Sequence, residues 1–449
     1  MHYKLKKPNL NKIKKEEFSE ALLNKKKDEI FDFVKKSNEP EYLYWDKVQY
    51  KKPMPKNIKP EILWMIIKFI RESSSLSTDI KDISDKNFKW HKLPSYEAFF
   101  HNLDLNLGGE LAITKKESDI KNKQKFISRG IMEEAIASSQ LEGAVTSRQV
   151  AKKMIKEGRK PRNESEQMIM NNYQTMLALE EKYRDKKMGM ELLSELQGMI
   201  TKNTVDGDGK IPMLRTAKDL IYVADRSNGE IYHTAPDICF VKKELKNFFK
   251  FANDGLEGDH FIHPVIKAIM LHFWLGFLHP FTDGNGRLAR LLFYWYLLKH
   301  DYWAFAYLPI SAIIKKSPVQ YKMAYVYSEQ DDNDLTYFID YNIKKIKQAM
   351  VDFQNYVETQ SKNNKEINKE VKVKYKFNER QIQVLQYFCG DPDERTNMKT
   401  HINIFQVAKM TAIKDLRELE GNGFLTAQKE GRNVFYYPTE KINELFKKK

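Results

Sequence analysis

Residues 279–290 read HPFTDGNGRLAR, which places a histidine, a carboxylate, two glycines and two arginines within twelve positions. Pro280 disfavours helix in the residue before it, so the apolar helix that carries LHFWLGFL should end near His279. A glycine-rich turn that leads into a helix presents backbone N–H groups and a positive dipole end to an anion. Arg287 and Arg290 lie three apart on that helix, and their planar guanidinium groups suit phosphate oxygens.

The same loop supplies a metal ligand and a base. Asp283 offers one hard oxygen ligand, and one carboxylate together with substrate phosphates is a usual way to hold Mg²⁺. His279, with an ordinary pKa of about 6.5, can take a proton from a hydroxyl at neutral pH. The sequence contains no GxxxxGK[ST], HRD or DFG motif, which excludes a P-loop and a protein-kinase site. The loop therefore predicts a di- or triphosphate site with Mg²⁺ and one candidate base.

The loop also fits the signature HPFx(D/E)GNGRxxR of the Fic (Fic/Doc) family at every constrained position. This resemblance implies a mainly α Fic helical domain and the transfer of AMP from ATP to a Ser, Thr or Tyr hydroxyl of a target protein. It implies that His279 is the general base, that Asp283 binds Mg²⁺ and that Phe281 anchors the loop in the core. The phosphate contacts would come from Gly284, Asn285, Gly286, Arg287 and Arg290.

A second stretch, SSQLEG at 138–143, fits the inhibitory pattern (S/T)xxxE(G/N) of the same family. Ser138 and Glu142 lie four apart, on one helical face. In the family, this glutamate pairs with the second arginine of the signature, here Arg290, which would otherwise reach the γ-phosphate while Arg287 reaches the β-phosphate. The alternative is an ordinary acid at a helix end beside Gly143. Because the segment precedes the loop, the chain resembles the subclass with an N-terminal inhibitory helix, near residues 132–146.

Residues 211–236 interrupt the helical pattern, and turn residues at 227–229 between two β-prone runs predict a small β-hairpin. In the family, a hairpin flap at this place aligns the target by strand pairing. For His233, a flap or surface role is favoured over that of a second catalytic histidine. The flap residues would be Gly229, Glu230, Ile231, Tyr232, His233 and Thr234.

The C-terminal end predicts three helices followed by a β-hairpin, which is the order of a winged helix-turn-helix domain. The stretch TAIKDLRELEGNGFL resembles the recognition helix of that class, which usually enters the major groove of DNA. Acidic residues at 415, 418 and 420 weaken its basic face, and such modules also contact proteins. The candidate DNA contacts are Lys409, Thr411, Lys414 and Arg417.

Composition and length set the organisation. With 449 residues the chain is long enough for two or three domains. The net charge of +15 is concentrated at the ends, with +7 in residues 1–60 and +6 in residues 361–449. We expect a basic helical N-terminal extension at 1–95, a Fic domain at 96–360, a linker or exposed helix end at 361–376, and a winged helix-turn-helix domain at 377–449.

Several features predict a soluble cytoplasmic protein with no membrane partner. No window approaches the roughly 18 apolar residues that a spanning helix needs, and no apolar run follows the basic start to make a signal peptide. Cys239 and Cys389 are too few and too isolated for a disulfide framework or a zinc site, which fits a reducing compartment.

Two classes of function compete at this point. The first is a protein adenylyltransferase that uses ATP and Mg²⁺ and is inhibited by Glu142. The second is a DNA-binding regulator in which the Fic domain senses a nucleotide. Within the enzyme class, transfer of another phosphate-containing group or removal of AMP stays open. The target protein is not specified by the sequence, and a homodimer is an expected assembly of this layout.

Overall fold

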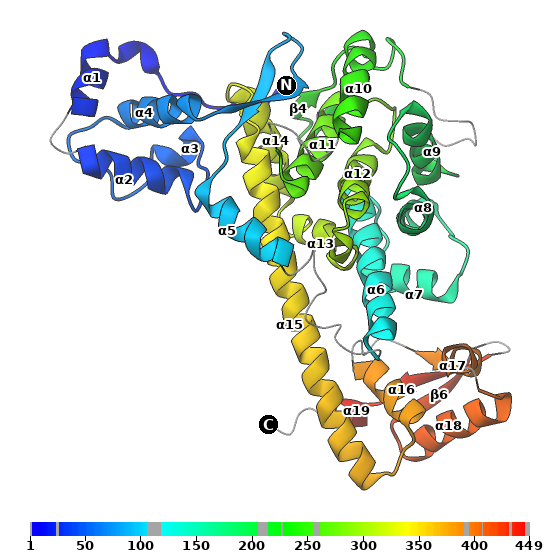
Figure 1. The fold of residues 1–449 in the computed structure, drawn as a ribbon. Helices are drawn as coiled ribbons and strands as arrows, with labels where there is room; N and C mark the ends of the chain where they lie inside the picture. Colours follow the sequence, from blue (N-terminus) through cyan, green and yellow to red (C-terminus); the bar gives the residue numbers. More distant parts are fainter. Residues whose placement is uncertain are drawn as a thin grey trace. The chain divides into compact units, whose positions relative to one another are not determined.

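The structure is a computed structural model that describes residues 2–23, 27–105, 118–204, 214–225, 228–254, 261–389, 395–405, 407–430 and 433–444. The chain divides into two compact units, Met1–Ala349 and Met350–Lys449. Helices dominate both units (Figure 1), and this confirms the expected mainly α class. No helix within the described ranges is long and apolar enough to cross a membrane.

Two apolar helices form the centre of the first unit (Figure 1). Every residue of α11 (Pro264–Leu278) is buried, and so are most residues of α12 (Asn285–Lys299). A helix that is apolar on all sides must be covered on all sides. The helices that pack on this pair are α6 (Ser118–Leu141), α9 (Met190–Thr201) and α10 (Ile238–Asn253), and α8 (Glu164–Ala178) packs on α6 and α9.

The remaining helices of the first unit complete its surface. Helix α7 (Arg148–Glu157) shows why helix boundaries fall where they do: the Ser147 side chain caps its first turn, and Gly158 adopts the left-handed conformation that ends it. The others are α5 (Pro94–Leu103), α13 (Ile310–Ile314), α14 (Pro318–Gln330), the start of α15 (Thr336–Lys374), and the short turns η3 (Leu179–Tyr183) and η4 (Trp303–Tyr307).

The N-terminal part contains helices and one hairpin. A short turn η1 (Leu10–Lys12) is followed by α1 (Lys15–Leu23), α2 (Lys27–Asn38), α3 (Trp45–Val48) and α4 (Pro60–Ser73). The antiparallel hairpin of β1 (Leu76–Lys81) and β2 (Asn87–Trp90) was not predicted. This part belongs to the same compact unit as the helices that follow, and α5 runs across the boundary expected at residues 95 and 96.

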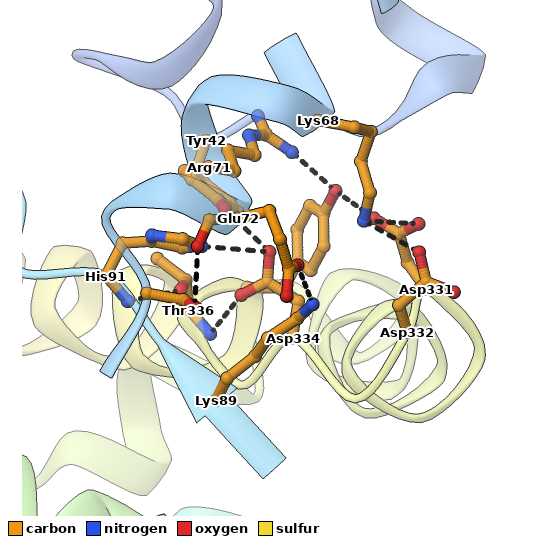
Figure 2. A network of polar contacts seen from close by, with 12 residues as sticks. Tyr42, Lys68, Arg71, Glu72, Lys89, His91, Asp331, Asp332, Asp334 and Thr336 are labelled. Atoms are coloured by element: carbon orange, nitrogen blue, oxygen red, sulfur yellow. Dashed lines mark hydrogen bonds and ion pairs between the residues drawn. The ribbon is translucent and has the colours of Figure 1, made fainter. Parts of the chain in front are cut away.

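A buried polar network joins α4 to the segment between α14 and α15 (Figure 2). The Arg71 guanidinium is 3% exposed, lies 3.6 Å from the centre of the Tyr42 ring and donates to the Tyr337 hydroxyl at 2.8 Å. Lys68 forms ion pairs with Asp331 at 3.0 Å and Asp332 at 3.1 Å. Because buried charges are tolerated only with partners, this network fixes the end of α14 against the N-terminal helices.

The hairpin expected near residues 227–229 is confirmed. Strand β3 (Tyr222–Ala224) pairs antiparallel with β4 (Ile231–Thr234), and a register shift lies between Val223 and Ala224. Residue 227 of the expected turn lies outside the described residues. The hairpin is called the flap below, and its β4 strand contacts α14.

The second unit has its own core. The end of α15 is followed by α16 (Glu379–Cys389), β5 (Thr396–Asn397), α17 (Met398–Phe405), α18 (Lys409–Gly421), β6 (Leu425–Glu430), β7 (Asn433–Pro438) and α19 (Glu440–Glu444), and the sheet order is β5-β7-β6. Residues 361–374, expected as a linker or helix end, continue α15, and Val371 packs into this core with Leu385, Leu416 and Phe424.

Candidate active site

His279 lies at the C-terminal end of α11, as the following proline predicts. Its backbone is left-handed (φ 43°, ψ 60°), and its N–H donates to the Leu275 carbonyl at 3.0 Å. The ring Nδ1 faces the Gly276 carbonyl, which can only accept, so Nδ1 carries a proton. In the neutral ring, Nε2 therefore keeps the lone pair that can accept a proton.

The surroundings of His279 keep its ring neutral. Burial disfavours the charged form, and the neighbouring His233, whose ring centre lies 5.9 Å away, adds a repelling positive charge. Together they lower the pKa of His279 to about 4. A histidine with this pKa is unprotonated throughout the neutral range, as a general base must be.

The loop is shaped by its own side chains. The Asn285 amide donates to the Phe281 carbonyl at 2.8 Å and accepts from the Phe281 N–H at 3.0 Å. Phe281 is 2% exposed, in agreement with its expected place in the core. The side chain of Asn285, expected to contact phosphates, thus uses both its polar atoms to hold the loop.

Gly284 gives the loop the turn into α12. Its φ of 77° is left-handed, and a Cβ at this position would approach the Gln197 amide of α9 to 2.9 Å. Gln197 also donates to the Asp283 carbonyl. The start of α12 therefore lies directly on α9.

Arg287 lies on α12, as expected, with its side chain directed toward the end of α9. Its side chain is fully buried, donates to the Ile200 carbonyl at 3.0 Å and forms an ion pair with Asp283 at 2.7 Å. These contacts fix the loop to the end of α9, and the expected contact with a β-phosphate stays a prediction. The sequence spacing placed Arg287 on α12 correctly but could not show that the Ile200 carbonyl lies beside it.

Asp283 retains the chemistry of a metal ligand. Its side chain is 38% exposed, and Arg287 contacts only Oδ2. Within the described ranges, no group of three or more His, Cys, Asp or Glu side chains could hold a metal ion. The fit is thus to an ion that takes one carboxylate oxygen from the protein and its other ligands from substrate and water, as Mg²⁺ does.

The structure brings Arg290 together with both residues of the SSQLEG motif. Arg290 is 3% exposed; its Nε donates to the Ser138 hydroxyl at 2.8 Å, and one terminal nitrogen reaches the Ser138 carbonyl at 2.9 Å and Glu142 at 2.8 Å. Burial alone would raise the pKa of Glu142, but the charge and hydrogen bond of Arg290 outweigh it, so this pKa lies below its usual value. Glu142 is therefore ionised and paired.

The Glu142 carboxylate also lies on the start of α12. A Cβ added at Gly286 would collide with both its oxygens. Backbone N–H groups and the positive dipole end of α12 favour an anion at this place. A carboxylate of the chain thus occupies the position that the sequence assigned to phosphates, 144 residues away in the chain from Gly286.

Residues 166–297 match the model of the Fic/DOC family. The chain contains a Fic/DOC domain. The matched range runs from α8 through the flap to α12, and it ends before α15 and begins after SSQLEG. Loop, flap and α9 therefore belong to the family domain, whereas Glu142 reaches it from outside the matched range.

Curated relatives match over short segments. The chain is 45% identical over 53 residues to "Protein adenylyltransferase fic-1" of Caenorhabditis elegans, and 40% identical over 62 residues to "Protein adenylyltransferase Fic" of Nematostella vectensis. These segments are 12% and 13% of this chain and only 10% and 14% of the relatives' own length.

Solved structures of the family are similar over longer ranges. A Fic family protein from Desulfovibrio desulfuricans aligns with a TM-score of 0.47 at 17% identity and covers 78% of this chain and 97% of its own. Fic-1 from Caenorhabditis elegans aligns with a TM-score of 0.47 at 15% identity and covers 76% of this chain and 88% of its own.

Within the Fic/DOC domain, His233 has a role that the sequence did not suggest. Its Nδ1 lies 2.8 Å from the Glu329 carboxylate, and its Nε2 lies 2.8 Å from the Phe277 carbonyl. Both partners are acceptors, so both ring nitrogens carry protons and the ring is positively charged. Burial alone lowers the pKa of His233, but Glu329 raises it above its usual value. The expected flap position is correct, yet the ring is buried and adjacent to His279.

Arg215 is a second residue that was missed, although the stretch IPMLRTAKDL contains it. It is 5% exposed, and it donates to the carbonyls of His279 at 2.8 Å and of Pro236. Its own N–H donates to the Pro280 carbonyl at 3.0 Å. Arg215 thus ties the end of the flap to the catalytic loop, which a sequence pattern cannot show.

The candidate DNA contacts of the second unit lie on α18. Lys409, Lys414 and Arg417 are exposed, and Thr411 is half-buried. Asp415, expected to weaken this face, is 2% exposed and pairs with Arg380 at 2.7 Å and His401 at 3.1 Å. That expectation for Asp415 was wrong because the carboxylate points into the unit, so the exposed face is more basic than its sequence suggested.

Proposed function

We propose that the protein is an adenylyltransferase that transfers AMP from ATP to a Ser, Thr or Tyr hydroxyl of a target protein and is restrained by Glu142. The observation that carries the proposal is the position of the Glu142 carboxylate. It pairs with Arg290 and lies on Gly286 at the start of α12, beside a histidine kept neutral by its surroundings.

His279 would act through Nε2. The target hydroxyl gives its proton to this nitrogen while its oxygen attacks the α-phosphorus of ATP, and the bond between the α-phosphorus and the bridging oxygen to the β-phosphate breaks. The products are an AMP phosphodiester on the target and pyrophosphate. The hydrogen bond from Nδ1 to the Gly276 carbonyl holds the ring in the tautomer that the proton transfer needs.

The start of α12 would bind the polyphosphate. Backbone N–H groups at Gly284 to Gly286 and the dipole of α12 attract the negative charge, and Arg290 would hold the γ-phosphate. Mg²⁺, when bound to Asp283, would neutralise charge that builds up on the departing pyrophosphate. Arg287 contributes indirectly, because its ion pair with Asp283 orients that carboxylate.

Restraint follows from competition for Arg290. Glu142 uses a guanidinium nitrogen that the γ-phosphate would need, and it adds a negative charge where a second anion would arrive. Hydrogen bonds to charged groups contribute roughly 1.5–3 kcal/mol. Freeing Arg290 should therefore favour productive ATP binding by about tenfold to a hundredfold.

The test is transfer of label from α-labelled ATP, with Mg²⁺, to proteins of a cell lysate. Glu142→Gly should raise labelling, and the nearly isosteric Glu142→Gln, which removes the charge but keeps the volume, should raise it less. Unchanged labelling in Glu142→Gly would contradict restraint by this residue. Label transferred from another nucleotide, or AMP released from labelled proteins, would instead identify one of the other Fic reactions.

A DNA-binding regulator is the second candidate, and the exposed basic face of α18 favours it. Phosphate contacts from Lys409, Lys414 and Arg417 would weaken steeply with salt. A gel shift of the full chain at low salt tests this, with Lys414→Glu and Arg417→Glu as variants. No shift at low salt would leave the second unit as a protein-contact module.

A further inference from the structure

Strand β4 of the flap has two edges, and β3 pairs with only one of them. The Glu230 carbonyl accepts from Asp225 on the β3 side at 2.8 Å. Successive carbonyls of an extended strand point to opposite edges, so the Ile231 carbonyl faces the outer edge. There it accepts from the N–H of Tyr3 at 2.8 Å, and His2 forms a parallel bridge with Ile231.

The segment His2–Leu5 is held along its main chain. Besides the bond to Ile231, the Tyr3 carbonyl accepts from the Gln330 amide at 3.1 Å, and the Leu5 N–H donates to the same amide at 2.9 Å. One Gln330 side chain thus contacts a donor and an acceptor of an extended strand. Such contacts bind a backbone irrespective of its side chains.

Side chains of the segment alternate as in a strand. The Tyr3 ring stacks on the Tyr232 ring of the flap at 4.9 Å, and Leu5 is 7% exposed, whereas His2 and Lys4 are exposed. The Tyr232 ring is itself fixed, because the Lys322 ammonium lies 3.8 Å from its centre and its hydroxyl donates to Glu230 at 2.8 Å. The edge thus accepts an aromatic and an aliphatic side chain two positions apart.

Gln330, which contacts the main chain of His2–Leu5, is itself held in place by its neighbours. Gln330 is the last residue of α14, and the next two residues are the Asp331 and Asp332 carboxylates that pair with Lys68 (Figure 2). Further on, Asp334 accepts from the Tyr42 hydroxyl at 2.6 Å. The polar network therefore holds the Gln330 amide in position to bind an extended chain.

We propose that His2–Leu5 occupies the flap edge on which the target's extended segment pairs, so that a target must displace it. This rests on the proposed function, because the flap aligns a target only if the protein modifies one. The segment then indicates the substrate class: an extended stretch with an aromatic and an aliphatic residue at alternate positions. It also adds a restraint on target binding that is separate from the one on ATP.

A binding experiment tests the pairing without any activity. The probe is a fluorescent peptide of residues 2–8, HYKLKKP, added to the full chain and to a variant that lacks residues 1–7. We expect saturable binding to the shortened variant and at least tenfold weaker binding to the full chain. The control peptide KYLHKKP has the same composition without the alternation and should bind neither. Equal binding of HYKLKKP to both proteins, or to neither, would overturn the pairing.

A labelling experiment tests the competition. In the Glu142→Gly background, the deletion should lower the KM for protein targets about tenfold, since roughly 1.4 kcal/mol corresponds to that factor, and leave the KM for ATP unchanged. Tyr3→Ala should also lower the KM for protein targets, whereas Lys4→Ala, at an exposed position, should leave it unchanged. These two substitutions test the competition even if the deletion unfolds the chain.

The two proposals fail in different ways. If Glu142→Gly labels targets but neither the deletion nor Tyr3→Ala changes the KM for them, the competition is wrong and the proposed function stands. If neither the wild type nor Glu142→Gly labels any protein, both the proposed function and the competition are wrong. The peptide experiment then still decides whether His2–Leu5 pairs with the flap.

Discussion

The loop at 279–290 and the hairpin of β3 and β4 both border the candidate active site, but they are held in different ways. The loop has contacts of its own as well as contacts to other elements: Asn285 bonds Phe281, and Arg287 pairs with Asp283, each four positions away. The flap is held by distant parts of the chain, because Glu329 bonds His233 and Tyr3 bonds Ile231.

This difference in contacts indicates which part of the site stays fixed, the loop, and which part can exchange its contacts, the flap. A loop that has internal contacts and is also tied to α9 should keep His279 and the start of α12 in place whatever is bound. If the protein has the proposed activity, a flap whose contacts come from elsewhere can exchange them for contacts to a target. Glu142 would act on nucleotide binding in the same way, since it reaches the loop from outside the matched family range.

The largest expected effect is on the loop. His279→Ala in the Glu142→Gly background should lower AMP transfer by about 100- to 10,000-fold, the usual contribution of a general base. Thermal unfolding should change little, because Nδ1 makes one hydrogen bond to a backbone carbonyl. Residual transfer above a hundredth of the parent rate would assign the base elsewhere.

A smaller effect should follow from loosening the loop's own contacts. Arg287→Ala leaves the Ile200 carbonyl without its donor and should lower the free energy of unfolding by about 1–3 kcal/mol. Urea unfolding followed by tryptophan fluorescence reports this, because all six tryptophans lie in the first unit. Arg162→Ala, at an exposed position, is the matched control and should change stability by less than about 0.5 kcal/mol.

A substitution beside the flap should change the free energy of unfolding less, and by an amount that depends on pH. Glu329→Gln removes the charge that raises the pKa of His233, so it should cost about 1 kcal/mol of stability at pH 6. A pKa raised on folding contributes stability that is fully present below about pH 6.5, the unfolded value, and is lost as pH rises through the folded value. The difference between wild type and variant should therefore shrink by pH 9. A difference that grows with pH would show that His233 is not the charged partner.

The smallest effect concerns the pH dependence of transfer. Because the pKa of His279 is lowered to about 4, kcat/KM of Glu142→Gly at saturating Mg²⁺ should stay nearly constant between pH 7.5 and 5.5. A base with an ordinary pKa of about 6.5 would lose roughly tenfold at one unit below it. A tenfold loss by pH 5.5 would mean that burial and His233 do not control this base.

The contrast between local and distant contacts explains which features could be predicted from the sequence. The loop, the helices on either side of it, the flap hairpin and the partnership of Ser138 and Glu142 with Arg290 follow from local patterns and one family signature. The charged His233, the ties made by Arg215 and the pairing of His2–Leu5 do not, because their partners lie far away in the sequence. Asp415 was misjudged because its carboxylate was counted with the basic face of α18, whereas it is buried against Arg380. The contact of Arg287 with the Ile200 carbonyl could not be predicted, because the two residues lie far apart in the sequence.

The central claim is that Glu142 competes with the outer phosphates of ATP for Arg290. The most direct measurement is calorimetric binding of ATP and of AMP, with Mg²⁺, to two His279→Ala proteins, one that keeps Glu142 and one that also carries Glu142→Gly. Because AMP lacks the β- and γ-phosphates, we expect that Glu142→Gly strengthens ATP binding about tenfold or more and leaves AMP binding unchanged. Equal changes for both nucleotides, or no change for either, would contradict it.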